Sequence, residues 1–119
     1  MDKVNLNEKF SLFNEHWTPK IVGELNDQMV MLAKVKGEFV WHRHVEQDEL
    51  FLVVKGAITI RMRDREVHLK EGEFFIVPRN TEHQPFAEEE AHLLLFEPKT
   101  TRHTGEEKFD VTVENPEWL

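Results

Sequence analysis

Residues 37–56 read GEFVWHRHVEQDELFLVVKG, a stretch with two histidines and one glutamate spaced for a shared site. Side chains two residues apart on a β-strand point to the same face, so His42 and His44 would enter one space. Glu49 is an odd number of residues from His44, so it reaches that space only if the chain turns between them. The polar residues 45–48 supply such a turn, after which Glu49 would open a second strand beside the first.

Two imidazoles and one carboxylate on neighbouring strands suit a divalent first-row transition metal. An isolated His-x-His pair is more often two exposed histidines on a strand, so the rest of the chain has to decide between the two interpretations. The chain has no cysteine, which excludes a disulfide framework and a thiolate metal site. Any metal would be bound by His, Asp or Glu side chains.

Length and charge limit the function classes. A chain of 119 residues predicts one domain, with a core over residues 21–98 and a C-terminal tail over 99–119. The 23 acidic residues exceed the 15 basic ones, and the net charge of −8 opposes binding to nucleic acid or to an anionic membrane. No signal peptide and no apolar run of membrane-spanning length is evident, so we expect a cytoplasmic protein.

Short apolar runs separated by turn residues predict about eight strands and at most one short helix, typical of an all-β sandwich or barrel. Near the N-terminus, Asn5 as a helix cap with Glu8 three residues later predicts a short helix, with an extended edge segment as the alternative. The expected strands are 21–22, 29–33, 50–54, 57–62, 67–70, 73–77 and 91–97.

Three of these strands, at 51–54, 74–77 and 93–96, are apolar on both faces and need cover outside as well as inside the barrel. The sequence therefore predicts a homodimer that buries the outer face of one sheet, aided by the N-terminal segment. The tail carries Val111 and Val113 at strand spacing, and it could dock across a sheet or cover the barrel mouth.

A second informative string runs from Gly72 to His83. Pro78 ends a strand because it cannot donate a ladder hydrogen bond, and Asn80 tolerates the left-handed conformation of a tight turn. His83 would begin the returning strand and bring a third imidazole to the first cluster. Alone, His83 would more often be a loop histidine.

Together the two strings resemble the paired motifs of the cupin superfamily. The matching residues are Gly37, His42, His44, Glu49 and Gly56 in the first motif and Gly72, Pro78, Asn80, His83 and Ala87 in the second. The sequence departs from the family pattern in having four residues between His44 and Glu49 rather than five, Asn80 for a usual glycine, and Ala87 for a usual asparagine. The motifs span residues 37–87, and the whole chain is similar to small single-domain cupins of the mannose-6-phosphate isomerase-like group.

The resemblance implies a double-stranded β-helix, the cupin jelly-roll barrel, with a short N-terminal helix or edge segment. It also implies one divalent metal, Fe, Mn, Ni, Zn or Cu, inside the barrel. The implied ligands are His42, His44, Glu49 and His83, of which spacing had already indicated the first three. An octahedral ion would keep up to two open positions, where an oxygen could be polarised or water or dioxygen activated.

Four further residues are candidates for the pocket lining: Met31, Phe51, Phe86 and His92. Either face of the strand around His92 could point inward. We interpret His92 as a partly buried, hydrogen-bonded histidine, with an acid or base next to the metal ligands as the less favoured alternative. His16, His68 and His103 are not expected to be ligands. By strand parity Arg43 and Arg61 point away from the site, which disfavours phosphate substrates.

The leading functional hypothesis is a metal-dependent isomerase or oxygenase acting on a small oxygen-rich molecule, such as a sugar derivative, a diketone or a flavonoid-like phenol. The alternative is a non-catalytic cupin that binds a metal and a small molecule as a sensor, carrier or accessory protein. A purely structural cupin without metal is the least favoured, because all four ligand types are present.

Overall fold

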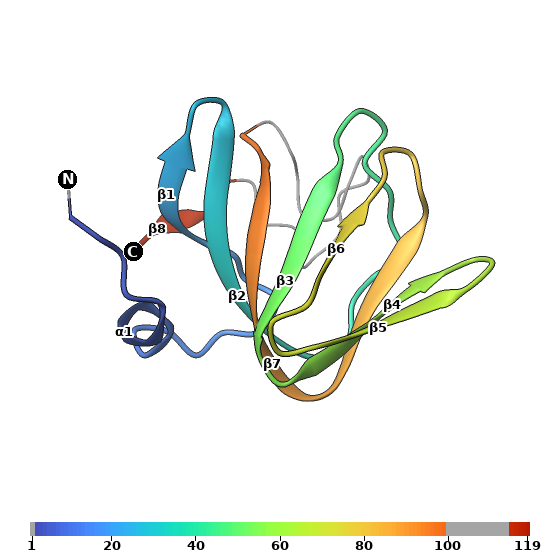
Figure 1. The fold of residues 1–119 in the computed structure, drawn as a ribbon, viewed down its shortest axis with the longest axis horizontal. Helices are drawn as coiled ribbons and strands as arrows, with labels where there is room; N and C mark the ends of the chain where they lie inside the picture. Colours follow the sequence, from blue (N-terminus) through green and yellow to red (C-terminus); the bar gives the residue numbers. More distant parts are fainter. Residues whose placement is uncertain (1, 100–114) are drawn as a thin grey trace.

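A computed structural model describes residues 2–99 and 115–119, which form one short helix and eight strands (Figure 1). The all-β prediction is confirmed. The elements are α1 (Leu6–Phe10), β1 (Lys20–Leu25), β2 (Gln28–Glu38), β3 (Glu49–Lys55), β4 (Ala57–Met62), β5 (Glu66–Lys70), β6 (Phe74–Val77), β7 (His83–Pro98) and β8 (Glu117–Trp118).

The long strand β7 joins the two halves of the barrel (Figure 1). Its first residues pair antiparallel with β4, where His83 lies opposite Met62. Its later residues lie between β2 and β3, so that Leu94 is opposite Leu32 on one side and Leu52 on the other. The strands β1, β5 and β6 extend the sheet from β2, β4 and β3 respectively. Because β7 serves both halves, its inward face passes along the whole interior.

The interior is filled by residues that alternate along the strands, as a sheet with one buried face requires. On β7, Leu93 and Leu95 are buried while Leu94 and Phe96 between and beyond them are only partly buried. The buried core includes Met31, Ala33, Val35, Phe51, Val53, Ile58, Ile60, Leu93 and Leu95. Apolar burial of this kind is the main driving force for closing the barrel.

The N-terminal segment covers part of the outer face (Figure 1). The helix prediction is confirmed, since the Asn5 side chain accepts a hydrogen bond of 3.0 Å from the backbone N–H of Glu8. Phe10 and Phe13 then pack against the outward-facing Val22 and Leu32 of β1 and β2. The chain itself thereby supplies some of the outer cover that the two-sided apolar strands require.

The described C-terminal end, residues 115–119, docks at the edge of the sheet. Strand β8 pairs parallel with β1, and the backbone N–H of Leu119 donates to the carbonyl of Ile21 at 2.9 Å. Val111, Val113 and His103 lie outside the described residues. No helix in the described part of the chain is both long enough and apolar enough to span a membrane.

Two expectations about the strands were wrong. His42 and His44 lie in an extended loop over residues 39–48 rather than on a regular strand, with one isolated bridge between His42 and His83. The backbone stays extended there because it pairs with the start of β7, so His42 and His44 are buried and Arg43 between them is exposed. His83 begins the returning strand as predicted, but no loop separates it from the strand expected at 91–97, because β7 runs unbroken from His83 to Pro98.

Candidate metal centre

The structure brings the four predicted ligands together at one end of the barrel interior. His42, His44, Glu49 and His83 are all buried, and each offers a ligand atom within 4.8 Å of the others. His42 and His44 come from the loop after β2, Glu49 is the first residue of β3, and His83 is the first residue of β7. The turn expected between His44 and Glu49 is present and compensates for their odd spacing. The arrangement is a set of three imidazoles and one carboxylate.

Two of the imidazoles have a fixed tautomer. Nδ1 of His42 donates to the carbonyl of Val40 at 2.9 Å, and Nδ1 of His83 donates to the carbonyl of Thr81 at 2.9 Å. Because a carbonyl oxygen can only accept, each Nδ1 carries the proton and each Nε2 carries a lone pair. Both Nε2 atoms are buried without a hydrogen-bond partner. A metal ion would satisfy both, and this backbone bonding is how metal-binding histidines are commonly oriented.

The electrostatics keep two of the four residues, His42 and Glu49, in their metal-binding forms. Burial lowers the pKa of His42 from 6.5 to about 3, and the neighbouring His83 adds to this effect, so His42 is neutral at physiological pH. Burial alone would raise the pKa of Glu49, but the hydrogen bond from His44 Nε2 at 3.0 Å holds that pKa well below 4.5. A neutral imidazole and an ionised carboxylate are the forms that bind a metal.

A second buried carboxyl, Glu97 on β7, lies behind Glu49. Glu97 is 1% exposed, and neither of its carboxyl oxygens has a hydrogen-bond donor. Burial, followed by the negative charge of Glu49, raises the pKa of Glu97 well above 4.5. Sequence analysis missed Glu97, although it has the same parity as the inward-facing Leu93 and Leu95.

The turn between β6 and β7 is hydrogen-bonded to the loop between β2 and β3, and these two segments carry the two sequence motifs. Asn80 has a φ of 59°, so the residue in the usual glycine position adopts the left-handed conformation that the sequence allowed. Its backbone N–H donates to the carbonyl of His44 at 2.6 Å, and the backbone N–H of Arg79 donates to Asp48 Oδ1 at 2.7 Å. These bonds fix the turn that carries His83 against the loop that carries His44.

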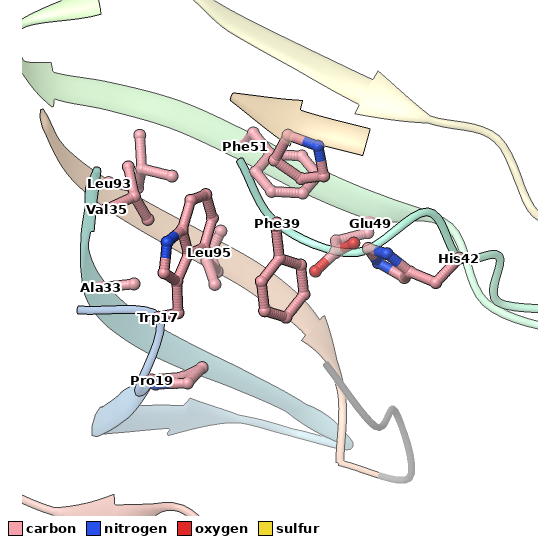
Figure 2. A pocket seen from close by; sticks show the side chains of 11 residues that line it. Trp17, Pro19, Ala33, Val35, Phe39, His42, Glu49, Phe51, Leu93 and Leu95 are labelled. Atoms are coloured by element: carbon pink, nitrogen blue, oxygen red, sulfur yellow. The ribbon is translucent and has the colours of Figure 1, made fainter. Parts of the chain in front are cut away.

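A cavity adjoins the cluster and extends along the barrel interior (Figure 2). Including its open mouth, its volume is about 350 Å³. It is lined by Trp17, Pro19, Ala33, Val35, Phe39, His42, Glu49, Phe51, Pro85, Leu93 and Leu95. Figure 2 shows the Glu49 carboxylate and the His42 imidazole at one end of this apolar space. A small molecule in the cavity would therefore lie beside the four-residue cluster.

Of the four residues predicted to line the pocket, Phe51 does so and the other three do not. Met31 is buried in the core away from the cavity wall. Phe86 has outward parity and packs 4.3 Å beneath the guanidinium of Arg61. His92 also faces outward and stacks on Phe10 with ring centroids 4.5 Å apart. This agrees with the interpretation of His92 as a partly buried histidine rather than an acid or base of the site.

The sequence analysis missed two aromatic residues of the wall, Trp17 and Phe39. Trp17 lies between α1 and β1, outside any periodic segment, and Phe39 follows the last residue of β2. Their rings stack with centroids 4.7 Å apart and an interplanar angle of 18°. Neither local pattern predicts that contact, which depends on the pairing of residues 16 and 17 with β2.

Comparison with known proteins gives a consistent family and fold. The profile of the family described as cupin domain matches residues 29–97. The crystal structure of a cupin-2 domain containing protein from Shewanella frigidimarina NCIMB 400 is 46% identical, with a TM-score of 0.80 over 81% of this chain and 94% of that chain. Protein NMB1881 from Neisseria meningitidis is 27% identical, with a TM-score of 0.76 over 82% of this chain and 100% of that chain.

A curated relative is described as the uncharacterized protein YdbB of Bacillus subtilis (strain 168). It is 39% identical over 64 residues, which are 53% of this chain and 57% of the relative. The match thus spans little more than half the length of that relative.

Proposed function

Because this chain belongs to the cupin domain family and buries a cluster of histidines and a glutamate, we propose that it is a metal-dependent enzyme. Its substrate is a small oxygen-bearing molecule, and its reaction is an isomerisation or an oxygenation. The metal ligands are His42, His44, Glu49 and His83. The observation that carries the proposal is the pair of buried Nε2 atoms of His42 and His83, which have lone pairs and no hydrogen-bond partner.

A bound Fe, Mn, Ni, Zn or Cu ion would supply a Lewis acid, or for some of these metals a redox centre, at the end of the cavity. The protein's own part is to orient His42 and His83 through their Nδ1 hydrogen bonds and to keep water away by burial. Glu49 supplies the one carboxylate charge among the four proposed ligands, so a divalent ion would keep a net positive charge. The remaining positive charge favours an electron-rich oxygen atom of the substrate.

A non-catalytic role in binding a metal and a small molecule is the second candidate. Of the residues lining the cavity, only His42 and Glu49 have titratable side chains, and both are proposed metal ligands. No separate general base or nucleophile is therefore available on the described wall of the cavity. This observation favours a sensor, carrier or accessory role.

A reconstitution experiment separates the two candidates. Metal-free protein would be reloaded with Fe²⁺, Mn²⁺, Ni²⁺, Zn²⁺ or Cu²⁺ and incubated with acetylacetone, a phenol or a hexose. Oxygen uptake and proton NMR spectra would report turnover, with the His42→Ala/His83→Ala variant as the control. Metal-dependent turnover that the control lacks supports the enzyme, and binding without turnover supports the second candidate. A metal-loaded protein that neither binds nor converts any of these compounds contradicts both.

We also propose that two copies associate through the outer face of β6 and β3. Phe74 and Ile76 on the edge strand β6 are 59% and 47% exposed, and they lie opposite Leu52 and Leu50 of β3. The described N-terminal segment packs on the β1 and β2 side of the sheet and leaves these four apolar residues without cover from α1. Sedimentation velocity should give a dimer that Phe74→Lys converts to a monomer, and a monomeric wild-type protein at micromolar concentration contradicts the proposal.

A further inference from the structure

We propose that the cavity selects a small, flat and largely apolar molecule, such as an aromatic or conjugated carbonyl compound, that turns one uncharged oxygen toward the four-residue cluster. This inference deepens the proposed function, since the oxygen-directed end of the ligand depends on the metal proposed above. The apolar selection depends only on the walls of the cavity. The two parts can therefore fail separately.

The composition of the wall disfavours sugars. Nine of the eleven lining residues are apolar, and the two polar ones, His42 and Glu49, lie together in the metal-binding cluster. No hydroxyl, amide, lysine or arginine side chain is among the described residues of the wall. A sugar would bury several hydroxyl groups against these surfaces without hydrogen-bond partners, and each unpaired group weakens binding.

Two buried lysines, Lys20 of β1 and Lys34 of β2, are engaged on the outer side of the sheet. Lys20 Nζ bonds to Glu15 at 3.1 Å and to Glu117 at 2.8 Å, and Lys34 Nζ donates to the carbonyl of Phe13 at 2.7 Å. Neither lysine is part of the cavity wall. A phosphate or carboxylate on the ligand would thus find no lysine or arginine side chain in the described wall, and only the proposed metal ion could pair with it.

Trp17 and Phe39 give the cavity a flat aromatic wall. Their rings are nearly parallel, at 18°, with centroids 4.7 Å apart, and Figure 2 shows them side by side at the cavity. Trp17 has a φ of 58°, a conformation that is unusual for a bulky residue and that marks functional sites when the surroundings enforce it. Both N–H groups of Trp17 are held, the backbone one by the carbonyl of Lys34 and Nε1 by the carbonyl of Lys36, each at 2.8 Å.

The chain thus holds the indole in place through an uncommon backbone conformation and two hydrogen bonds. Because Nε1 already donates to a backbone carbonyl, Trp17 offers a ligand its apolar ring and no free donor. The empty space of about 350 Å³ includes open solvent at the mouth, so the enclosed part of the cavity is smaller than this volume. A single ring with a short substituent fits these walls better than a large or branched ligand.

The test is an NMR titration of metal-free protein and of protein loaded with Zn²⁺, using acetophenone, toluene, mannose and mannose 6-phosphate. The indole N–H signal of Trp17 reports occupation of the cavity, and Trp17→Gly identifies that signal while keeping the positive φ available. Trp118→Ala on β8 is the control, because Trp118 is exposed and is not in the wall. Phe39→Leu is a second wall variant.

Acetophenone and toluene should both shift the Trp17 signal in metal-free protein and bind at least about tenfold more tightly than mannose or its phosphate. Trp17→Gly and Phe39→Leu should weaken this binding, by about tenfold for Trp17→Gly, whereas Trp118→Ala should leave it unchanged. Zn²⁺ should tighten binding of acetophenone and not of toluene. If only this last difference fails, the metal-directed end is wrong and the apolar selection stands. Binding of mannose as tight as that of acetophenone, or binding unaffected by both wall variants, overturns the inference.

Discussion

Acidification of the metal-free protein should reduce its stability through His42. Folding buries this imidazole and lowers its pKa from 6.5 to about 3, so below pH 6.5 the unfolded chain binds a proton that the folded chain does not. The free energy of unfolding therefore falls as the pH decreases from 6.5 toward 3. Above pH 6.5 both states are neutral at His42, and this contribution is constant.

The magnitude follows from the two pKa values. Each tenfold change in proton affinity corresponds to about 1.4 kcal/mol, so the interval from 6.5 to about 3 limits the full effect to about 5 kcal/mol. Between pH 8 and pH 5 the same linkage predicts a loss of about 2 kcal/mol from His42 alone. That is a large fraction of the stability of a small domain.

The assay is urea unfolding of chelator-treated protein at pH 8, 6.5 and 5, monitored by tryptophan fluorescence. The matched variant is His42→Gln, which keeps a polar side chain and removes the titration. The difference in unfolding free energy between wild type and variant should change by about 2 kcal/mol over this range, with the wild type losing more. If the two proteins lose equal stability on acidification, His42 is not a buried neutral imidazole and the reasoning about its Nε2 lone pair is wrong.

Three further predictions concern the site and its support. In calorimetric titration, His83→Ala should weaken metal binding by more than the roughly 10–100-fold that is typical when a hydrogen-bond partner of a metal ligand is lost. The control is His68→Ala on the exposed face of β5, which should leave the metal affinity unchanged. Glu97→Gln should raise the melting temperature of metal-free protein at pH 8 and not at pH 4. The pKa of Glu97 is raised in the folded protein, so above pH 4.5 the unfolded chain loses a proton that the folded chain keeps, and the free energy of unfolding falls. An unaltered melting temperature at pH 8 would contradict the burial of Glu97 beside Glu49. Phe10→Ala should destabilise the protein by about 3–5 kcal/mol in urea unfolding, because Phe10 of α1 is buried against Val22 of β1 and Leu32 of β2. A loss below about 1 kcal/mol would argue against this packing of the N-terminal segment on the sheet.

Most of the fold could be predicted from the alternation of apolar and polar residues along the strands and from the turn residues between them. The strand 57–62 was predicted with its observed bounds, and Asn5 capped the helix as its spacing with Glu8 indicated. The start of β7 at His83 was predicted, but its continuity was missed because residues 88–90 are three consecutive glutamates, a run that is typical of a loop. Pairing of residues 83–86 with β4 outweighs that local preference.

His42, His44 and Glu49 could be predicted because their spacing is specified by strand parity and by one turn, whereas His83 was assigned from the resemblance of the second motif to the cupin pattern. The wall of the cavity could not be predicted, since it depends on contacts between segments far apart in sequence. Met31 and Phe86 were predicted for the wall by residue type alone, yet one lies in the core and the other faces outward. Trp17 reaches the cavity through its positive φ and its bonds to residues 34 and 36, and no sequence period encodes either feature.

The central claim is that the barrel binds a metal through three histidines and one glutamate, and elemental analysis tests it most directly. Untagged protein purified without chelator would be compared with the His42→Ala/His83→Ala variant, each before and after incubation with Fe²⁺, Mn²⁺, Ni²⁺, Zn²⁺ and Cu²⁺. The account predicts close to one metal ion per chain in the wild type and none retained by the variant. If both proteins are equally empty after metal is offered, the four residues do not form a metal centre.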